Sequence, residues 1–269
     1  MSTIFNKPIN EVIKLRHSVR NYDDKYLSQD IIDKIENYIS DIDNPFGSKV
    51  RVKLIKKDNS NKEIKLGTYG VVKGAKYYLA VACEKGDFDL EGLGYVFEHV
   101  ILYCTSLGLG TVWMGGTFSK SSFAKAMDLK ENEKIVIVSP LGYEGGKKSL
   151  LASIMGNNNK RRKSYEEVFF NNDFSNPLSK EAAGNYAEIL EMVRIAPSAI
   201  NKQPWRILKR GNEINFYKDG IIEMNKIDMG IALCHFHLMA KECGLNGNFK
   251  VIDSKVDTKY KYVISWISE

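Results

Sequence analysis

Hydrophobic positions along the chain predict alternating helices and strands. Apolar side chains at helical spacing predict a helix that follows Ser28 and a long, strongly apolar helix over residues 90–107. Residues 50–55 alternate between polar and apolar, as strands do, whereas residues 77–83 and 134–142 are nearly continuous apolar runs typical of buried strands. Shorter helices are predicted over residues 8–15 and 119–127. We expect the helix over 90–107 to be the centre of the core.

The pattern repeats in the last hundred or so residues. Residues 94–108 and 230–244 carry Gly, His and Gly at the same internal spacing. A helix predicted over residues 178–192 begins with the same Leu-Ser pair that precedes the helix after Ser28. Self-similarity of this kind indicates duplication of a structural unit.

The composition agrees with a large globular core. The chain has 269 residues, of which 43% are hydrophobic, enough for one large domain or two small ones. No stretch approaches the roughly 20 uninterrupted apolar residues of a membrane span, and the first residues form no long apolar run. We therefore expect a cytoplasmic protein that does not bind membranes.

The charge and the metal-ligating residue types point to no further partner. The net charge of +6 comes from 39 basic and 33 acidic residues that are scattered, without a basic and aromatic platform for nucleic acid. The histidines have no metal-ligand spacing, so no metal site is expected. The cysteines lie in apolar patterns without C-x-x-C spacing and are predicted to be reduced core residues: Cys83, Cys104, Cys234 and Cys243.

A polar loop precedes the apolar run that begins at Trp205. Pro197 and Ser198 suit a turn, and Asn201 and Gln203 add amide side chains to the backbone N–H groups of the loop. Such a loop can bind a planar, polar ligand. An ordinary helix-to-strand turn would explain the Pro-Ser pair but not the ordered amides that follow it.

Basic residues form two further candidate sites. Arg16, His17, Ser18 and Arg20 lie within five residues, and the Arg fork of donors matches phosphate oxygens. An exposed basic loop is the alternative. Residues 160–163 are four consecutive basic residues, for which a solvated surface is the usual meaning.

Two glycine-rich turns complete the candidate ligand contacts. Gly67 and Gly70 bracket Thr68 and Tyr69, so this loop can approach a ligand closely. Paired glycines at 115–116 follow a short predicted strand, where a bare turn is the alternative.

These segments resemble the motifs of FMN-dependent nitroreductases. Residues 196–205 match A-P-S-x-x-N-x-Q-P-W, and residues 16–22 match R-[RH]-S-x-[RK]-x-[FY]. Residues 108–116 match G-L-G-x-x-W-x-G-G, and residues 160–168 resemble the ending K-x-R-x-x-x-E-E-V. The resemblance covers nearly the whole chain and implies an FMN cofactor.

The resemblance also implies roles for these residues. The FMN phosphate and ribityl chain would be held by Arg16, His17, Ser18 and Arg20, with Lys160 and Arg162 as a second pair of cations. The flavin would contact Pro197, Ser198, Ala199, Asn201 and Gln203 of the loop and the backbone of Met114, Gly115 and Gly116. Donors at the glycine turn would stabilise negative charge on reduced flavin. Thr68 and Val71 stand where the family often has an Asn and a Lys, which leaves Thr68 and Tyr69 as candidates.

The position of the amide signature is unusual for the family. Nitroreductases are homodimers that hold FMN between the arginine motif of one subunit and the amide loop of the other, whereas this chain has one motif in each half. It therefore resembles a fused dimer, as in the TM nitroreductase subfamily. We expect an α+β nitroreductase fold with mainly antiparallel sheets, residues 1–171 and 172–269 as its halves, and a monomer with internal pseudo-twofold symmetry.

The function implied is that of an FMN-dependent oxidoreductase. NAD(P)H would reduce the flavin, which would reduce a planar small molecule such as a nitroaromatic or a quinone; no catalytic side chain is predicted. The alternatives are another flavin reaction such as reductive dehalogenation, a flavin-binding storage or sensing protein, and a binder of anions or nucleic acid. The loop at 45–49 lacks the amides, and Glu167 aligns with Arg16, so one flavin per chain is expected.

Overall fold

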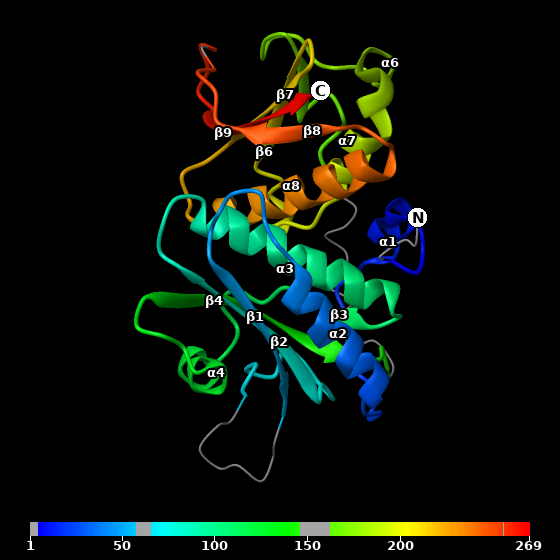
Figure 1. The fold of residues 1–269 in the computed structure, drawn as a ribbon, viewed down its shortest axis with the longest axis vertical. Coiled ribbons are helices and arrows are strands. Elements are labelled where there is room, and N and C mark those ends of the chain that lie inside the picture. Colours follow the sequence, from blue (N-terminus) through cyan, green and yellow to red (C-terminus); the bar gives the residue numbers. More distant parts are fainter. Residues whose placement is uncertain (1–4, 58–65, 146–161, 255) are drawn as a thin grey trace. The chain divides into compact units, whose positions relative to one another are not determined.

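The computed structural model describes residues 5–57, 66–145, 162–254 and 256–269 (Figure 1). The chain folds into two compact units. The first unit contains residues 1–7 and 15–157, and the second contains residues 8–14 and 158–269. This division groups residues 8–14 and 158–171 with the second unit, whereas the duplication pattern assigns them to the first half.

The first unit contains a four-stranded antiparallel sheet with the order β1-β2-β4-β3. Its strands are β1 (Val50–Lys56), β2 (Tyr77–Glu84), β3 (Gly110–Thr111) and β4 (Glu133–Gly142). Val81 pairs with Ile137 and Ala82 with Ile135, which leaves Val136 as an extra residue in a β-bulge. The strands predicted from the apolar runs are confirmed.

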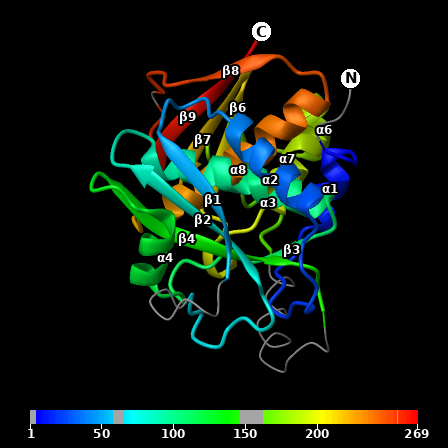
Figure 2. The same cartoon turned by 60° about the horizontal axis from the view of Figure 1, so that its bottom comes forward.

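Three helices accompany this sheet: α2 (Gln29–Asp41), α3 (Asp89–Ser106) and α4 (Lys120–Met127), which Figure 2 shows from a second side. Seven of the eight residues of β2 are buried. Tyr78 belongs to a core cluster with Phe123 and Met127 of α4, and α3 packs on β2 as well. Because successive side chains of a strand point to opposite faces, burial on both faces explains the continuous apolar run.

The second unit contains a five-stranded sheet with the order β5-β6-β7-β9-β8. Its strands are β5 (Phe169–Asn171), β6 (Trp205–Arg210), β7 (Glu213–Lys218), β8 (Gly247–Lys250) and β9 (Lys261–Ser268). Its helices are α1 (Ile9–Leu15), α6 (Lys180–Ala183), η2 (Gly184–Tyr186), α7 (Ala187–Arg194), η3 (Ala199–Asn201) and α8 (Met224–Glu242). The parallel pairing of β5 with β6 is the exception in an otherwise antiparallel sheet.

The single helix predicted over residues 178–192 is wrong. Ser179 caps α6 by accepting a hydrogen bond from the N–H of Ala182 at 3.1 Å, but α6 ends after four residues. Gly184 has φ 56° and ψ −127°, a conformation that a right-handed helix cannot contain. A 3₁₀ turn follows, and α7 begins at Ala187.

The two sheets share one strand order, apart from the added strand β5 of the second unit. The order β6-β7-β9-β8 repeats β1-β2-β4-β3, with α8 in the place of α3. The second sheet has a bulge as well, at Val263 of β9, because Phe216 pairs with Ile264 and Tyr217 with Tyr262. His99 of α3 contacts the Tyr38 hydroxyl of α2 at 3.2 Å. His235 of α8 contacts the Met192 carbonyl of α7 at 2.9 Å.

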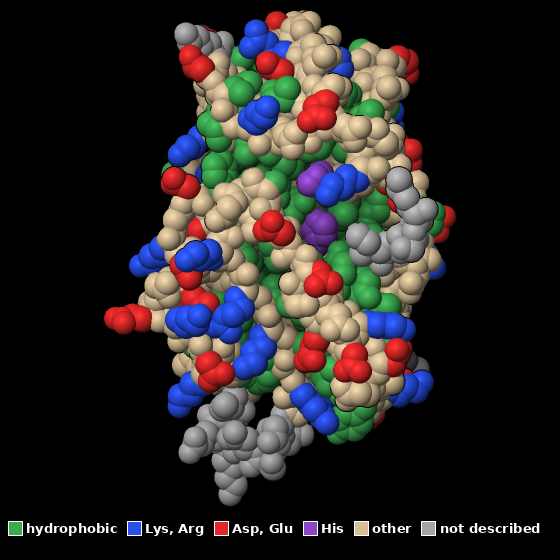
Figure 3. Space-filling view, viewed as in Figure 1, with side chains coloured by type: hydrophobic (Ala, Val, Ile, Leu, Met, Phe, Trp, Pro, Cys, Tyr) green, Lys and Arg blue, Asp and Glu red, His purple; other side chains and the backbone are tan. Residues whose placement is uncertain are grey.

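Other expectations from composition have mixed outcomes. Cys83, Cys104 and Cys234 are buried free thiols, whereas Cys243 is exposed at the end of α8, so its prediction as a core residue is wrong. In the part of the chain that the structure describes, no helix has the length and apolar character needed to cross a membrane. Acidic and basic side chains are interspersed on the face drawn in Figure 3.

Candidate functional site

Residues 195–204, here called the amide loop, connect α7 to β6 in the second unit. Ile200, Asn201 and Gln203 all have positive φ, of 46°, 57° and 48°. Left-handed backbone is unfavourable for side-chain-bearing residues, above all for a β-branched one such as Ile200. Three such residues within four positions require strong support from the surrounding structure.

Gln203 supplies much of this support. Its side chain is buried, and its Oε1 accepts a hydrogen bond from the Lys163 N–H at 3.2 Å. Its Nε2 donates to the Asn201 carbonyl at 3.3 Å, and its own backbone N–H donates to Ser198 Oγ at 2.9 Å. The side chain of Gln203, a predicted site residue, therefore stabilises the conformation of the loop. A ligand at this loop would meet backbone groups rather than the Gln203 side chain.

The amide loop has backbone donors to spare. The N–H of Asn201 bonds to the Ser198 carbonyl, and the N–H of Ala199 donates to Asp228 Oδ1 at 2.9 Å. The N–H groups of Ser198 and Ile200 donate to no other described residue. Ser198 is half-buried and Ile200 is exposed, so an acceptor on a ligand can reach this backbone.

Asp228, beneath the loop on α8, was missed from the sequence. Its side chain is 3% exposed, and its second oxygen, Oδ2, has no hydrogen-bond partner among the described residues. Burial raises the pKa of this carboxyl to about 7, against the opposing effects of the Ala199 N–H and the charge of Lys202. A lone Asp within an apolar helix gave no motif that would have marked it.

The basic segment after residue 161 is bound to the end of α7. Nη1 of Arg162 donates to the carbonyls of Arg194 at 3.2 Å and Ala196 at 2.8 Å. Arg194 pairs with Glu191 at 2.6 Å and donates to the Lys163 carbonyl at 3.1 Å. Arg162 thus supports the start of the amide loop. Lys160, the other predicted cation, lies outside the described residues.

In the first unit, the arginine motif is an extended segment bound to its neighbours by backbone hydrogen bonds. The N–H of Val19 donates to the Thr111 carbonyl at 2.9 Å, and the Arg20 carbonyl accepts from Lys73 at 2.9 Å. Gly110 allows this approach, since a Cβ there would lie 2.7 Å from Val19 Cγ2. Ser18 is exposed beside Thr111, with which it forms a β-bridge.

The two arginines of this motif differ from its histidine. Both Arg16 and Arg20 are half-buried, and burial lowers the pKa of each guanidinium. Nε of Arg20 is buried without an acceptor in the described part of the chain. His17 contacts the Leu15 carbonyl at 3.0 Å and Glu144 at 2.9 Å, at the surface. The arginines can therefore donate hydrogen bonds to an anion, whereas the His17 imidazole already contacts Leu15 and Glu144.

Glu98, a fully buried carboxylate on α3, connects two of the predicted motifs. Its Oε2 accepts from the indole N–H of Trp113 at 2.9 Å. Its charge opposes the burial-driven fall in the pKa of Arg16. Glu98 thus acts on both the arginine motif and the glycine turn, a role that the sequence did not indicate.

The glycine turn follows Met114. Met114 is buried, and its N–H and carbonyl pair with Val138 at 3.0 and 3.1 Å. The N–H groups of Gly115 and Gly116 have no acceptor among the residues that the structure describes. Such a pair of backbone donors suits an acceptor on a ligand.

The Thr68 loop is joined to the glycine turn. The Gly67 carbonyl accepts a hydrogen bond from the N–H of Ser119 at 3.0 Å. Thr68 is buried, while Tyr69 is 72% exposed with φ 47°. The structure therefore links these two candidates to residues 115–119 through the bond between Gly67 and Ser119.

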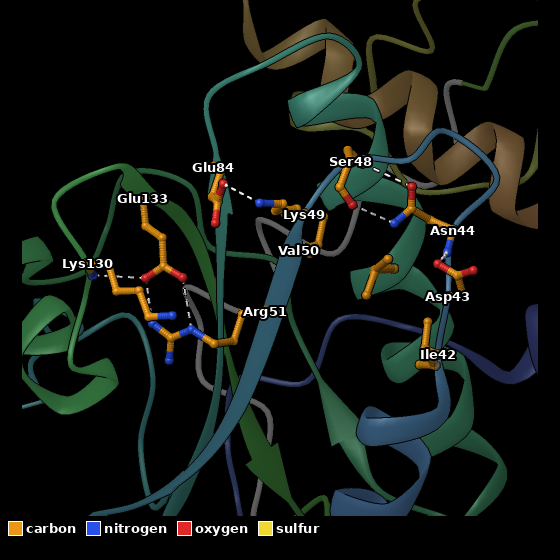
Figure 4. A pocket seen from close by; sticks show the side chains of 11 residues that line it. Ile42, Asp43, Asn44, Ser48, Lys49, Val50, Arg51, Glu84, Lys130 and Glu133 are labelled. Carbon is orange, nitrogen blue, oxygen red and sulfur yellow. Dashed lines mark hydrogen bonds and ion pairs between the residues drawn. The ribbon is translucent and has the colours of Figure 1, made fainter.

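Two cavities of the first unit adjoin the predicted segments. One, of about 500 Å³, is lined by Arg16, His17, Glu144 and the end of α3. The other, of about 310 Å³, lies beside residues 42–49 (Figure 4). Four of its six charged side chains form ion pairs: Lys49 with Glu84 at 3.3 Å and Arg51 with Glu133 at 2.6 Å.

The predicted site residues thus form two sets. The first unit holds Arg16, His17, Ser18, Arg20, Thr68, Tyr69, Met114, Gly115 and Gly116. The second unit holds Arg162, Pro197, Ser198, Ala199, Asn201 and Gln203.

Solved structures resemble the chain in fold. A nitroreductase-like protein from Thermotoga maritima is 21% identical, covers 97% of this chain and 94% of its own, and has a TM-score of 0.64. A nitroreductase family protein from Clostridium difficile 630 is 20% identical, covers 55% of this chain and 88% of its own, and has a TM-score of 0.42. An FMN-dependent nitroreductase from Clostridium difficile R20291 is 16% identical, with 51% and 88% covered and a TM-score of 0.41.

No curated protein matches the chain. Residues 8–240 match the family described as "Putative TM nitroreductase", which is most of the chain. The α+β fold with mainly antiparallel sheets, the Thermotoga maritima structure and this match agree, and the chain belongs to that nitroreductase family.

Proposed function

We propose that the protein is an FMN-dependent oxidoreductase that uses NAD(P)H to reduce planar acceptors such as nitroaromatics or quinones. Membership of a nitroreductase family supports the oxidoreductase class. The observation that carries the proposal is the amide loop, whose left-handed residues Ile200, Asn201 and Gln203 leave the N–H groups of Ser198 and Ile200 available. Such strained backbone is characteristic of ligand sites.

The residues present fit the parts of FMN. Arg20, with its buried and unsatisfied Nε, and the half-buried Arg16 suit a phosphate. The free N–H groups of Gly115 and Gly116 suit the N5 and O4 edge of a flavin. When bound, FMN would supply the hydride and electron transfer chemistry.

The contribution of the chain itself is binding, orientation and electrostatics. Arg16 and Arg20 would neutralise the phosphate, and the glycine turn would donate to the edge of the ring where negative charge accumulates. Gln203 would keep the amide loop in its binding conformation through the bonds to Lys163 and Asn201. Arg162, whose Nη1 is engaged by two carbonyls, would act on the phosphate through its charge, as would Lys160.

We further propose that residues 1–171 and 172–269 are the halves of a fused dimer and that the chain is a cytoplasmic monomer with one flavin. The repeated strand order and the paired β-bulges support a duplication. The amide loop has no amide-bearing counterpart at residues 45–49, which supports a single site.

Titration with FMN tests the proposal. We expect saturation at one FMN per chain, with quenched flavin fluorescence and a raised melting temperature, and weaker binding of FAD. No change in either signal, or saturation at two FMN per chain, would contradict it. Oxidation of NADH and NADPH with and without a quinone then separates an enzyme from a flavin-storage protein.

A further inference from the structure

The amide loop rests on a single buried carboxylate. Ala199, in the middle of the loop, donates its N–H to Asp228 Oδ1 at 2.9 Å, and the three left-handed residues begin at the next position. The turn is closed by bonds from Asn201 to the Ser198 carbonyl and from Lys202 to the Ala199 carbonyl. Asp228 is the side chain of α8 that holds this turn to the helix.

The position of Asp228 is costly to maintain. Its side chain is 3% exposed and Oδ2 has no partner among the described residues. Ionised, it is a desolvated charge with one hydrogen bond; protonated, its hydroxyl lacks an acceptor. A structural contact of this kind could have been made by a neutral side chain at lower cost.

Neighbouring charges compensate little. Elements that pack against α8 carry charged side chains, among them Lys202 in the loop, Arg206 on β6, Lys218 on β7, and Glu191 and Arg194 on α7. Arg206 pairs with Asp219 at 2.6 Å, and Arg194 pairs with Glu191 at 2.6 Å. Of the described residues, Lys202 is the one whose charge stabilises the Asp228 carboxylate.

We propose that Asp228 is the positioning residue of the amide loop and makes the closure of that loop depend on pH. With the carboxyl protonated, the loop lies closed on α8; ionisation favours opening, because a carboxylate regains water when the loop lifts. That this opening affects a flavin rests on the proposed function above. The closure of the loop does not.

The size of the effect follows from linkage. Burial raises the pKa of Asp228 to about 7 in the closed loop, and a solvated Asp has a pKa of about 3.9. Between about pH 6 and about pH 8, the ratio of open to closed loop should rise roughly 10-fold. Above about pH 8 the Asp228 carboxyl is ionised in both the closed and the open loop. The ratio of open to closed loop should therefore level off there.

Amide hydrogen exchange of the ligand-free, full-length protein tests this directly. After correction for the intrinsic exchange rate, exchange of the hydrogen-bonded amides of Ala199, Asn201, Lys202 and Gln203 should rise about 10-fold from about pH 6 to about pH 8 in the unmodified protein. In Asp228→Asn, which keeps an acceptor at Oδ1 but cannot ionise, exchange should be the same at both pH values. Asp257→Asn removes an exposed carboxylate of the same unit and should leave the tenfold rise intact.

Flavin titration adds a second readout. Asp228→Ala removes the acceptor and should weaken FMN binding about 10-fold, while Asp228→Asn should restore it. Exchange that is independent of pH in the unmodified protein would overturn the inference, as would an equal rise in Asp228→Asn. Absence of FMN binding together with the expected exchange pattern would reject the proposed function and leave the loop mechanism standing.

Discussion

The loops that precede β1 in the first unit and β6 in the second differ in how they meet the long helix of their unit. In the first unit, residues 42–49 close on themselves: Asn44 Nδ2 donates to the Ser48 carbonyl at 2.8 Å, and Ser48 Oγ donates to Asn44 Oδ1 at 3.0 Å. Ser48 lies against Gly92 of α3, where a Cβ would be 1.7 Å from the Ser48 Oγ. The amide loop instead meets Asp228 on α8.

Gly92 and Asp228 occupy matching places, since Gly92 lies seven residues before His99 and Asp228 lies seven residues before His235. A glycine lets the first loop pack directly onto the helix, whereas a carboxylate holds the second loop by a backbone N–H. The two units therefore place different loops against matching positions of α3 and α8: a loop packed on Gly92 in the first unit and a loop hydrogen-bonded to Asp228 in the second.

The largest expected effect is on stability as a function of pH. Because the pKa of Asp228 is raised by burial to about 7, the native state binds more protons than the unfolded state between about pH 3.9 and about pH 7. The contribution of Asp228 to the free energy of unfolding is fully present below about pH 3.9 and is lost as the pH rises through about 7. The total loss is about 4 kcal/mol. His237, with its pKa lowered to about 4 by burial, acts in the opposite direction on acidification.

Urea unfolding at several pH values measures this loss. Asp228→Asn should be more stable than the unmodified protein at about pH 8, and the difference should shrink toward about pH 4. The contribution of His237 cancels in this difference because both proteins contain it. If the stability of Asp228→Asn follows that of the unmodified protein at every pH, the Asp228 carboxyl does not make the stability of the second unit depend on pH.

The next effect compares the arginine motif at residues 16–20 with the basic segment at residues 160–163. Arg16→Ala should weaken FMN binding by about 1.5–3 kcal/mol, roughly 10- to 150-fold, because one charge-assisted contact to a buried anion is lost. Lys163→Ala, which removes one charge of the basic segment of the second unit, should change affinity less than about twofold. Isothermal titration with FMN gives both values, and equal losses would indicate a diffuse positive field.

A smaller effect is expected at Gly92. Gly92→Ala should destabilise the protein by about 1–3 kcal/mol, because the new Cβ would overlap Ser48. Adding Ser48→Gly should recover much of this loss, as thermal unfolding can measure. FMN affinity should stay the same, and a loss as large as that of Arg16→Ala would mean that the loop at 42–49 takes part in binding.

The smallest effect compares the helix caps. Ser28 Oγ accepts from the Ile31 N–H at 3.4 Å, and Ser179 Oγ accepts from the Ala182 N–H at 3.1 Å. Ser28→Ala and Ser179→Ala should each cost about 0.5–1 kcal/mol in unfolding free energy. Replacement by Asp should retain the stability, and a larger cost at Ser179 would show that the short helix α6 supports the amide loop.

The predictable part of the fold depends on local patterns. Two buried faces make β2 a continuous apolar run, so its location follows from the sequence alone. The break at Gly184 could not be read in the same way, because a single glycine within a helical pattern is compatible with a continuous helix. Whether it bends the chain depends on the packing around α6 and α7.

Candidate site residues show the same limit. The order of Pro197, Asn201 and Gln203 predicted a ligand loop on the argument that a turn does not need amides at those positions, but the structure shows that the loop itself uses the Gln203 amide. The sequence did not reveal that Gln203 is turned inward to Lys163 and Asn201, nor that Arg162 supports the carbonyls of Arg194 and Ala196. Side chains with several donors can serve a ligand or the backbone, and burial decides between these uses.

Local patterns in the sequence predict β1, β2, β4 and the helices of the first unit and indicate a repeated unit, because apolar periodicity and glycine positions are local properties of the chain. Tertiary structure alone decided the environments of Asp228 and Glu98. Neither belongs to a motif, and a carboxylate acquires an altered pKa or a buried partner only when residues distant in sequence remove its water. The spacing of residues along the chain does not predict which carboxylates lose their water in this way.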